Sequence, residues 1–395
     1  MSLPLQGLRI IAIEQYGAGP FGTQHLADLG ADVLKIENRQ NGGDIGRQVG
    51  PHFFGPGDSH FHQALNRNKR SMTLNLKAPD GREVLHKLVA QGDALFNNLR
   101  GDLPGKLGLD YKTLSAVNPE IVCVHLSAYG RQGSRQNWPG YDYLMQAEAG
   151  YLHLTGEPDG PPTRCGLSIV DFMTGTTAAM ALLAGIIEAR RRGQGRDLDV
   201  SLFDVAIHNQ AYLSTWYLNG GHNTRRVERS GHPSLVPSEL YRTRDGWIFL
   251  MCNKEKFWSS LAELVNRPEW ISDPQFCDYK ARLANRIHLR QELDKVLSTD
   301  DTANWLARFA GKVPAAPVLD VAQALENPFL TEQQRITDFQ HTGHGAIRGI
   351  ASPVRITDVL PAQAAPQMGE HTDEVLQTLG YAEAQIEALH DKGVV

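Results

Sequence analysis

The sequence predicts an α/β protein in which a doubly wound parallel sheet is followed by a second, smaller α+β domain. Three observations predict this fold class. Short apolar runs alternate with helical patterns through about the first 200 residues, as they do in chains of strand–helix–strand units. A glycine turn of the form G-x-G-x-x-G joins the first apolar run to the first helical pattern. After residue 219 the pattern changes to a hairpin followed by helices.

The first half of the chain alternates strands with helices. Strands are expected at residues 8–13, 32–36, 94–99, 120–127 and 197–202, and helices at 19–29, 80–90 and 172–192. Gly30, Gly92 and Gly193 follow the three helical patterns, where glycine commonly ends a helix, and Asp80 is expected to cap the second helix. Successive apolar residues, as in "IVCV", are typical of parallel strands that are buried on both faces.

The second half predicts the smaller domain and a tail. The stretch "LYRTRDGWIFLMC" predicts a hairpin that turns at Asp245-Gly246. Helices are expected at residues 255–265, 281–297 and 302–309. The tail is expected to hold a strand at 347–354 and two short helices, at 373–379 and 382–389.

Composition excludes several classes of protein. The 395 residues exceed one ordinary core and predict two to three domains. A net charge of −5 with scattered basic residues argues against a nucleic-acid partner. The longest apolar run, 178–187, is shorter than the roughly 20 residues of a membrane span, so no membrane partner is expected. The histidine pairs at 60–62 and 341–344 lack accompanying cysteine or carboxylate ligands, so no metal site is predicted.

The start of the sequence and its cysteines predict a cytoplasmic protein. The first residues lack the basic-then-apolar layout of a secretion signal. The four cysteines are far apart and show no C-x-x-C spacing, which is typical of free thiols in a reducing compartment.

The glycine turn has two interpretations. Gly17, Gly19 and Gly22 match the dinucleotide fingerprint, and Glu37 lies about 20 residues beyond Gly17, where such proteins bind a ribose. The first interpretation is therefore a pyrophosphate-binding turn, as in a nicotinamide-dependent oxidoreductase. The other interpretation is a tight strand-to-helix turn in which glycine relieves backbone strain. Pro20 favours the second interpretation, because it removes an N–H that could bind phosphate.

Asp171 also has two interpretations. It follows a short apolar segment and directly precedes the helix expected at 172–192. It is either the N-cap of that helix or a weakly hydrated carboxylate that attacks a carbonyl carbon. In the second case the helix dipole and free N–H groups would hold the carboxylate ionised.

Several motifs resemble class III coenzyme A transferases, the CaiB/BaiF family that includes formyl-CoA:oxalate and carnitine CoA-transferases. They run in order through the chain: "YGAGPFGTQHLADLGADVLKIE", "NRNKRSMTLNLK", "LFNNLRGDLPGKLGLDYKTL", "LSAYGRQG", "PGYDYLMQAEAG", "GLSIVDFMTG" and "GEHTDEVLQTLG". The resemblance implies a Rossmann-like large domain that binds coenzyme A, at 1–220, and a small domain at 221–322. It also implies that residues 323–395 return to the large domain and that two chains form an interlaced homodimer.

The resemblance also implies a reaction. Asp171 would attack the carbonyl of an acyl-CoA to form an aspartyl mixed anhydride, which the released thiolate would convert to an aspartyl-CoA thioester. A free acid would then reverse these steps. The implied oxyanion donors are the amides near Gly17 and Ala18 and the side chain of Gln146. Acyl-CoA and a small carboxylic acid are the expected substrates, with succinyl-CoA as a candidate donor and no tightly bound cofactor.

Further residues are implied to bind these substrates. The positions that match the family's CoA-binding places are Arg39, Met72, Leu74, Asn98, Lys106 and Tyr129. Arg47 and His232 are expected to contact the acid, Arg47 through a carboxylate. Two departures from the family matter. The run of glycines typical of the oxalate branch is absent, and Tyr141 stands where the α-methylacyl-CoA racemase branch has a catalytic histidine, which weakens that alternative function.

Overall fold

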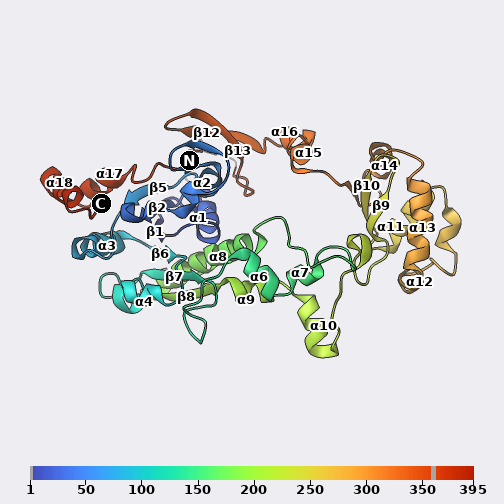
Figure 1. Ribbon diagram of the computed structural model, residues 1–395, viewed down its shortest axis with the longest axis horizontal. Coiled ribbons are helices and arrows are strands. Elements are labelled where there is room, and N and C mark those ends of the chain that lie inside the picture. Colours follow the sequence, from blue (N-terminus) through green and yellow to red (C-terminus); the bar gives the residue numbers. More distant parts are fainter. Residues whose placement is uncertain (1–2, 357–361) are drawn as a thin grey trace. The chain divides into compact units, whose positions relative to one another are not determined.

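The computed structural model describes residues 3–356 and 362–395 (Figure 1). The chain forms two compact units. The first consists of Met1–Ala149, Gly166–Ala211 and Thr331–Val395, and the second of Gly150–Cys165 and Tyr212–Leu330. Residues 150–165, which the sequence placed with the large domain, belong to the second unit. They are held there by Arg226, which donates to the carbonyl of Pro161 at 2.8 Å.

A six-stranded parallel sheet is the centre of the first unit. Its strands are β1 (Arg9–Ile13), β2 (Asp32–Glu37), β5 (Arg70–Thr73), β6 (Ala94–Asn97), β7 (Val122–Ser127) and β8 (Arg196–Ser201). They lie in the order β5-β2-β1-β6-β7-β8, and every neighbouring pair is parallel. This is the Rossmann order, with the switch point between β1 and β6. The predicted α/β class is confirmed, although β5 was not foreseen.

Helices α1 (Ala18–Asp28) and α8 (Ile169–Arg192) pack closely against each other beside this sheet. Gly22 and Gly175 permit the contact, because a Cβ on Gly22 would lie 2.4 Å from the carbonyl oxygen of Gly175. By length and composition alone α8 could cross a membrane. Half of its most apolar stretch of 18 residues is buried, as expected for a helix in the core of a folded unit. Gly193 ends α8 in a left-handed conformation, as predicted.

The C-terminal segment completes the first unit. Helices α17 (Thr372–Thr378) and α18 (Glu383–Asp391) lie near α3 (Pro79–Gln91) within this unit (Figure 1). Leu376 and Leu389 share one apolar core with Val84 of α3. Asp80 does not cap α3 as expected but lies in its first turn, because Ala78 occupies the N-cap position.

The second unit contains a three-stranded antiparallel sheet covered by helices. Strands β9 (Ser238–Arg242) and β10 (Trp247–Met251) form the predicted hairpin, and β11 (Ala315–Pro317) pairs with β10. Helices α11 (Glu255–Leu264) and α14 (Thr302–Phe309) match their predictions closely. The single helix expected at 281–297 is instead two helices, α12 (Tyr279–Ala284) and α13 (Arg286–Leu297), because Asn285 leaves the helical conformation.

Shorter elements connect these parts. The tail hairpin pairs β12 (Ile336–His341) with β13 (Gly345–Ile350), so the strand expected at 347–354 begins and ends earlier. The remaining elements are η1 (Arg39–Asn41), η2 (Ile45–Gln48), β3 (Phe53–Gly55), β4 (Asp58–Ser59), α2 (His60–Asn66), α4 (Leu103–Leu107), α5 (Tyr111–Leu114), α6 (Asp142–Glu148), α7 (Tyr151–Leu154), α9 (Leu202–His208), α10 (Tyr212–Gly220), η3 (Glu228–Ser230), η4 (Pro268–Ile271), α15 (Val321–Leu325) and α16 (Pro328–Glu332).

Candidate active site

The turn that follows β1 lies at the switch point of the sheet, where α/β proteins bind their ligands. The side chain of Asn98, which follows β6, forms hydrogen bonds with the backbone of this turn. Its Oδ1 accepts from the backbone N–H of Gln15 at 2.9 Å, and its Nδ2 donates to the carbonyl of Gln15 at 2.7 Å. A Cβ on Gly19 would lie 2.9 Å from Asn98 Cγ. Asn98 therefore positions the glycine turn, and its implied contact with coenzyme A stays a prediction.

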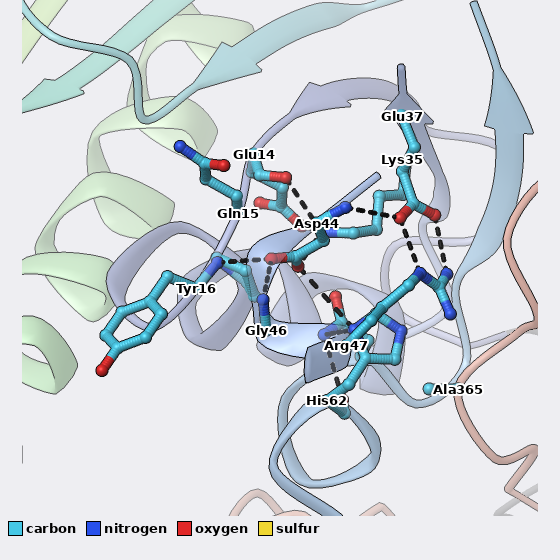
Figure 2. Close-up of polar contacts among 12 residues, drawn as sticks. Glu14, Gln15, Tyr16, Lys35, Glu37, Asp44, Gly46, Arg47, His62 and Ala365 are labelled. Atoms are coloured by element: carbon cyan, nitrogen blue, oxygen red, sulfur yellow. Dashed lines mark hydrogen bonds and ion pairs between the residues drawn. The ribbon is translucent and has the colours of Figure 1, made fainter. Parts of the chain in front are cut away.

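Buried charges hold the same turn from the other side (Figure 2). Lys35 Nζ donates to the carbonyl of Glu14 at 3.0 Å and lies 2.9 Å from Asp44 Oδ2. Asp44 Oδ1 accepts from the N–H of Tyr16 at 2.8 Å and from that of Gly46 at 2.7 Å. Burial raises the pKa of Asp44, but Lys35 and His62 together outweigh burial and hold that pKa well below its usual range. The carboxylate thus stays ionised.

These contacts hold Tyr16 in a left-handed conformation, with φ of 65°. A non-glycine residue adopts this conformation only where its surroundings impose it. The ring of Tyr16 lies 5.1 Å from that of Phe61 and 6.1 Å from that of Tyr141, between centroids. The next residue, Gly17, begins the turn into α1. Burial and the charge of Asp171 both raise the pKa of the Tyr16 phenol.

Asp171 faces Gly17. A Cβ on Gly17 would lie 2.4 Å from Asp171 Oδ2, so only glycine leaves room for this carboxylate. Asp171 is 5% exposed and lies in the first turn of α8. Burial, followed by the negative charge of Asp142, raises the pKa of Asp171 from 3.8 to about 7. The site therefore holds a carboxylate that is poorly solvated and titrates near neutral pH.

Asp171 is not the N-cap of α8, which corrects one of its two interpretations. Ser168 occupies that position and makes no side-chain cap bond. Asp142 of α6 caps the helix instead, because its Oδ2 accepts from the N–H groups of Val170 at 2.6 Å and Asp171 at 2.9 Å. The side chain of Asp171 is free of the capping role and lies against Gly17.

Gln146 supports Asp142 and does not lie open to a substrate. Its side chain is 0% exposed. Its Nε2 donates to Asp142 Oδ1 at 2.5 Å and to the carbonyl of Leu167 at 3.1 Å. This burial corrects the expected role of oxyanion donor. Ala18 begins α1 beside Gly17, and the first-turn N–H groups of a helix have no partners within the helix. The amides near Gly17 and Ala18 remain the candidate donors.

Arg47 does not lie where it could bind a substrate carboxylate, contrary to expectation. It is 1% exposed, and its Nε and Nη2 donate to the two oxygens of Glu37, each at 2.7 Å. Burial raises the pKa of Glu37, but Arg47, Lys35 and Ser71 together outweigh burial and lower that pKa to about 2. Ser71 also donates to Glu37, at 2.6 Å. Both oxygens of Glu37 are thus engaged, which argues against the ribose contact of a dinucleotide-binding protein.

The other residues expected to bind coenzyme A differ in accessibility. Met72 and Leu74 are buried in the core of the first unit. Arg39 is exposed in η1. Lys106 is exposed and its Nζ lies 2.6 Å from Asp102 Oδ2. The hydroxyl of Tyr129 donates to Glu148 at 2.8 Å. The binding roles of all five stay predictions.

His232 lies in the second unit. Its Nδ1 accepts from the backbone N–H groups of Ser234 and Leu235, both at 3.1 Å, so its proton is on Nε2 when the ring is neutral. Burial, followed by the charge of Arg286, lowers the pKa of His232. Its expected contact with the acid substrate stays a prediction.

The sequence interpretation missed Tyr16, Asp44 and Asp142. The signal for Asp142 was present in "GYDYL", where only the tyrosine was considered. The signal for Asp44 was a lone aspartate after two glycines, which is typical of many surface turns. The completed site combines a poorly solvated carboxylate with a rigid glycine turn. This combination suits attack on a carbonyl carbon.

Proteins of one family resemble this chain over nearly its whole length. The model of "CoA-transferase family III" matches residues 5–372. The chain is 32% identical to a succinate–glutarate CoA-transferase of Agrobacterium fabrum, over 95% of this chain and 96% of that protein. It is 32% identical to a succinyl-CoA:mesaconate CoA-transferase of Haloarcula hispanica, with the same coverage of each chain. A crystal structure of a CaiB/BaiF family protein from Brucella suis matches 96% of this chain and 100% of its own, at 30% identity and a TM-score of 0.83.

Proposed function

Because the chain belongs to CoA-transferase family III, we propose that it transfers coenzyme A from an acyl-CoA to a small free carboxylic acid, with Asp171 as the covalent nucleophile. The observation that carries this proposal is the buried Asp171 carboxylate, placed against Gly17 with a pKa of about 7. A carboxylate that water solvates poorly is a stronger nucleophile than one at the surface.

The reaction begins when an Asp171 oxygen attacks the thioester carbonyl carbon. The carbon–sulfur bond breaks, the CoA thiolate leaves, and an acyl–aspartyl anhydride remains. The thiolate then attacks Cγ of Asp171, the donor acid leaves as a carboxylate, and an aspartyl-CoA thioester remains. An acceptor carboxylate attacks the same Cγ and releases the thiolate. The thiolate finally attacks the acceptor's carbonyl carbon, which forms the new acyl-CoA and regenerates Asp171.

The turn before α1 supplies what each of these attacks needs. Negative charge develops on a carbonyl oxygen in every tetrahedral intermediate, and fixed N–H donors stabilise it. The amides of Ala18 and Gly19 are such donors, because they have no partners within the helix, whereas Pro20 has no N–H. Asn98 and Asp44 fix the preceding backbone through Gln15 and Tyr16. The donors are therefore held in place before the substrate arrives.

We propose succinyl-CoA as the donor and a small dicarboxylic acid as the acceptor. The support comes from the relatives, which are a succinate–glutarate CoA-transferase and a succinyl-CoA:mesaconate CoA-transferase. Arg47 no longer supports it, because Glu37 occupies its guanidinium. The interlaced homodimer that the sequence resemblance implied also remains a proposal.

Mass spectrometry of CoA exchange tests this function. The protein is mixed with succinyl-CoA and, in turn, glutarate, mesaconate and oxalate, and the new acyl-CoA is identified. Hydroxylamine is added in parallel to trap an acyl or thioester adduct on Asp171. Asp171→Ala is the inactive variant, and Asp80→Ala is the matched control, since Asp80 also lies in the first turn of a helix.

We expect a new acyl-CoA, and an Asp171 adduct only when acyl-CoA is present. Asp171→Ala abolishes both, and Asp80→Ala retains both. Full exchange by Asp171→Ala would refute the nucleophile. Deuterium entering the α-carbon of a branched acyl-CoA, with no free acid and no CoA exchange, would instead identify the racemase.

A further inference from the structure

Asp142 is a buried carboxylate that touches Asp171 only through the backbone. It lies in the first turn of α6 and is 4% exposed. Oδ2 accepts from the N–H groups of Val170 and Asp171, and Oδ1 accepts from the amide of Gln146. These three donors are neutral. They bind the negative charge of Asp142 by dipoles and leave that charge in place next to Asp171.

We propose that Asp142 is a positioning residue for the transfer: it fixes the first turn of α8, and its charge raises the free energy of the Asp171 carboxylate relative to the neutral forms of Asp171. The inference rests on the proposed function, in which Asp171 becomes an anhydride and then a thioester. It assigns a role to a second carboxylate beside the nucleophile.

The positioning part follows from the hydrogen bonds. A helix leaves its first N–H groups without partners, and a residue at the N-cap usually accepts from one of them. Ser168 does not do so here. Asp142, which belongs to a different helix, α6, accepts from two of these groups, the N–H groups of Val170 and of Asp171 itself. The backbone of Asp171 is thereby fixed relative to α6.

The charge part follows from how the charge of Asp171 changes during the reaction. Before attack, Asp142 and Asp171 are two negative charges that are each almost completely buried. In the anhydride and in the thioester, Asp171 is neutral and the repulsion is gone. An anhydride is intrinsically high in energy, so a destabilised starting carboxylate brings the two states closer together. The repulsion thus lowers the barrier to attack.

The titratable groups that face Asp171 come from two packed elements. Asp142 faces it from α6, and its charge raises the pKa of Asp171 together with burial. Tyr16 faces it from the turn before α1, and burial, followed by the charge of Asp171, raises the pKa of its phenol, so it stays neutral. Tyr141 and Tyr143 face Tyr16. A change in the charge of Asp142 is therefore expected to move the titration of Asp171 directly.

The test is the pH dependence of kcat/KM for wild type, Asp142→Asn and Asp142→Glu. Asparagine keeps the shape and an acceptor oxygen but removes the charge. Glutamate keeps the charge, but its longer side chain moves the acceptor oxygens away from their N–H donors. Circular dichroism confirms folding, and hydroxylamine trapping at Asp171 confirms the covalent intermediate in the wild type. A wild type without that adduct refutes the proposed function, which is a separate outcome.

We expect the acidic limb of the wild-type profile near pH 7. It moves to lower pH by about one unit in Asp142→Asn and stays in place in Asp142→Glu. Both variants have a lower kcat, since both disturb the first turn of α8. An acidic limb that does not move in Asp142→Asn, while trapping in the wild type succeeds, overturns the proposal. A wild-type limb below pH 5 overturns it even where neither variant folds.

Discussion

Asp171→Asn is expected to make the folded protein more stable, and the gain should grow with pH. The folded chain buries Asp171 beside the negative charge of Asp142, which raises the pKa of its carboxyl to about 7. An ionised Asp171 is therefore less stable in the folded chain than in the unfolded one. Asparagine has almost the same shape and no charge, so it removes this cost.

The magnitude follows from the pKa. A rise from 3.8 to about 7 is roughly three units, which at about 1.36 kcal/mol per unit costs the folded state ~4 kcal/mol above pH 7. Between pH 3.8 and 7 the folded chain holds a proton that the unfolded chain has released, so this group lowers stability as the pH rises. The variant should gain about 1–2 kcal/mol at pH 5 and about 4 kcal/mol at pH 8.

Urea unfolding of wild type and Asp171→Asn at pH 5 and pH 8, followed by circular dichroism, measures this difference. Asp80→Asn is the control, because Asp80 lies in the first turn of α3 with its side chain 41% exposed. The control should lose a few tenths of a kcal/mol of unfolding free energy, because the charge of Asp80 interacts favourably with the N-terminus of α3. Equal effects of Asp171→Asn at the two pH values would refute the burial argument, as would destabilisation at pH 8.

Three other perturbations have defined outcomes. Glu37→Gln leaves Arg47 buried without its counter-charge and should cost about 3–5 kcal/mol in urea unfolding; an unchanged midpoint would contradict the pairing. Gly22→Ala places a Cβ 2.4 Å from the backbone oxygen of Gly175 and should lower the melting temperature and activity together, because α1 must move away from α8. A full-length variant that melts like wild type would rule out this close contact. Lys106→Met should raise the KM for acyl-CoA several-fold and leave kcat and the melting temperature unchanged, because Lys106 is exposed and is expected to contact a phosphate of coenzyme A. An unchanged KM would show that Lys106 does not bind coenzyme A.

Local patterns predicted most of the elements. Alternating apolar runs located β1, β2, β6, β7 and β8, and the turn residues located the hairpin of β9 and β10. Strand β5 was missed because "RSMT" is short and has only one strongly apolar residue. The break at Asn285 was missed because both sides of it keep a helical pattern. Periodicity along the chain identifies long elements and is weak at short or interrupted ones.

In the candidate site too, local sequence signals predicted some features, and the tertiary structure decided the others. The glycine turn and Asp171 were identified from the sequence, since a glycine motif between strand and helix and a carboxylate at a helix start are local signals. Tertiary structure decided what each charged residue does. It paired Arg47 with Glu37 and made Asp142 the cap of a helix that begins 27 residues later in the chain, at Ile169.

The physical reason is that a charge in a sequence has no fixed partner. Backbone conformation depends mainly on neighbours within a few residues, so the sequence by itself determined the strand–turn–helix at Gly17 and the helix that starts beside Asp171. The free energy of a buried charge depends on the groups that surround it in space and on how much water remains. Those surroundings come from α6, α8 and the turn before α1 together, and only the folded chain brings them into contact.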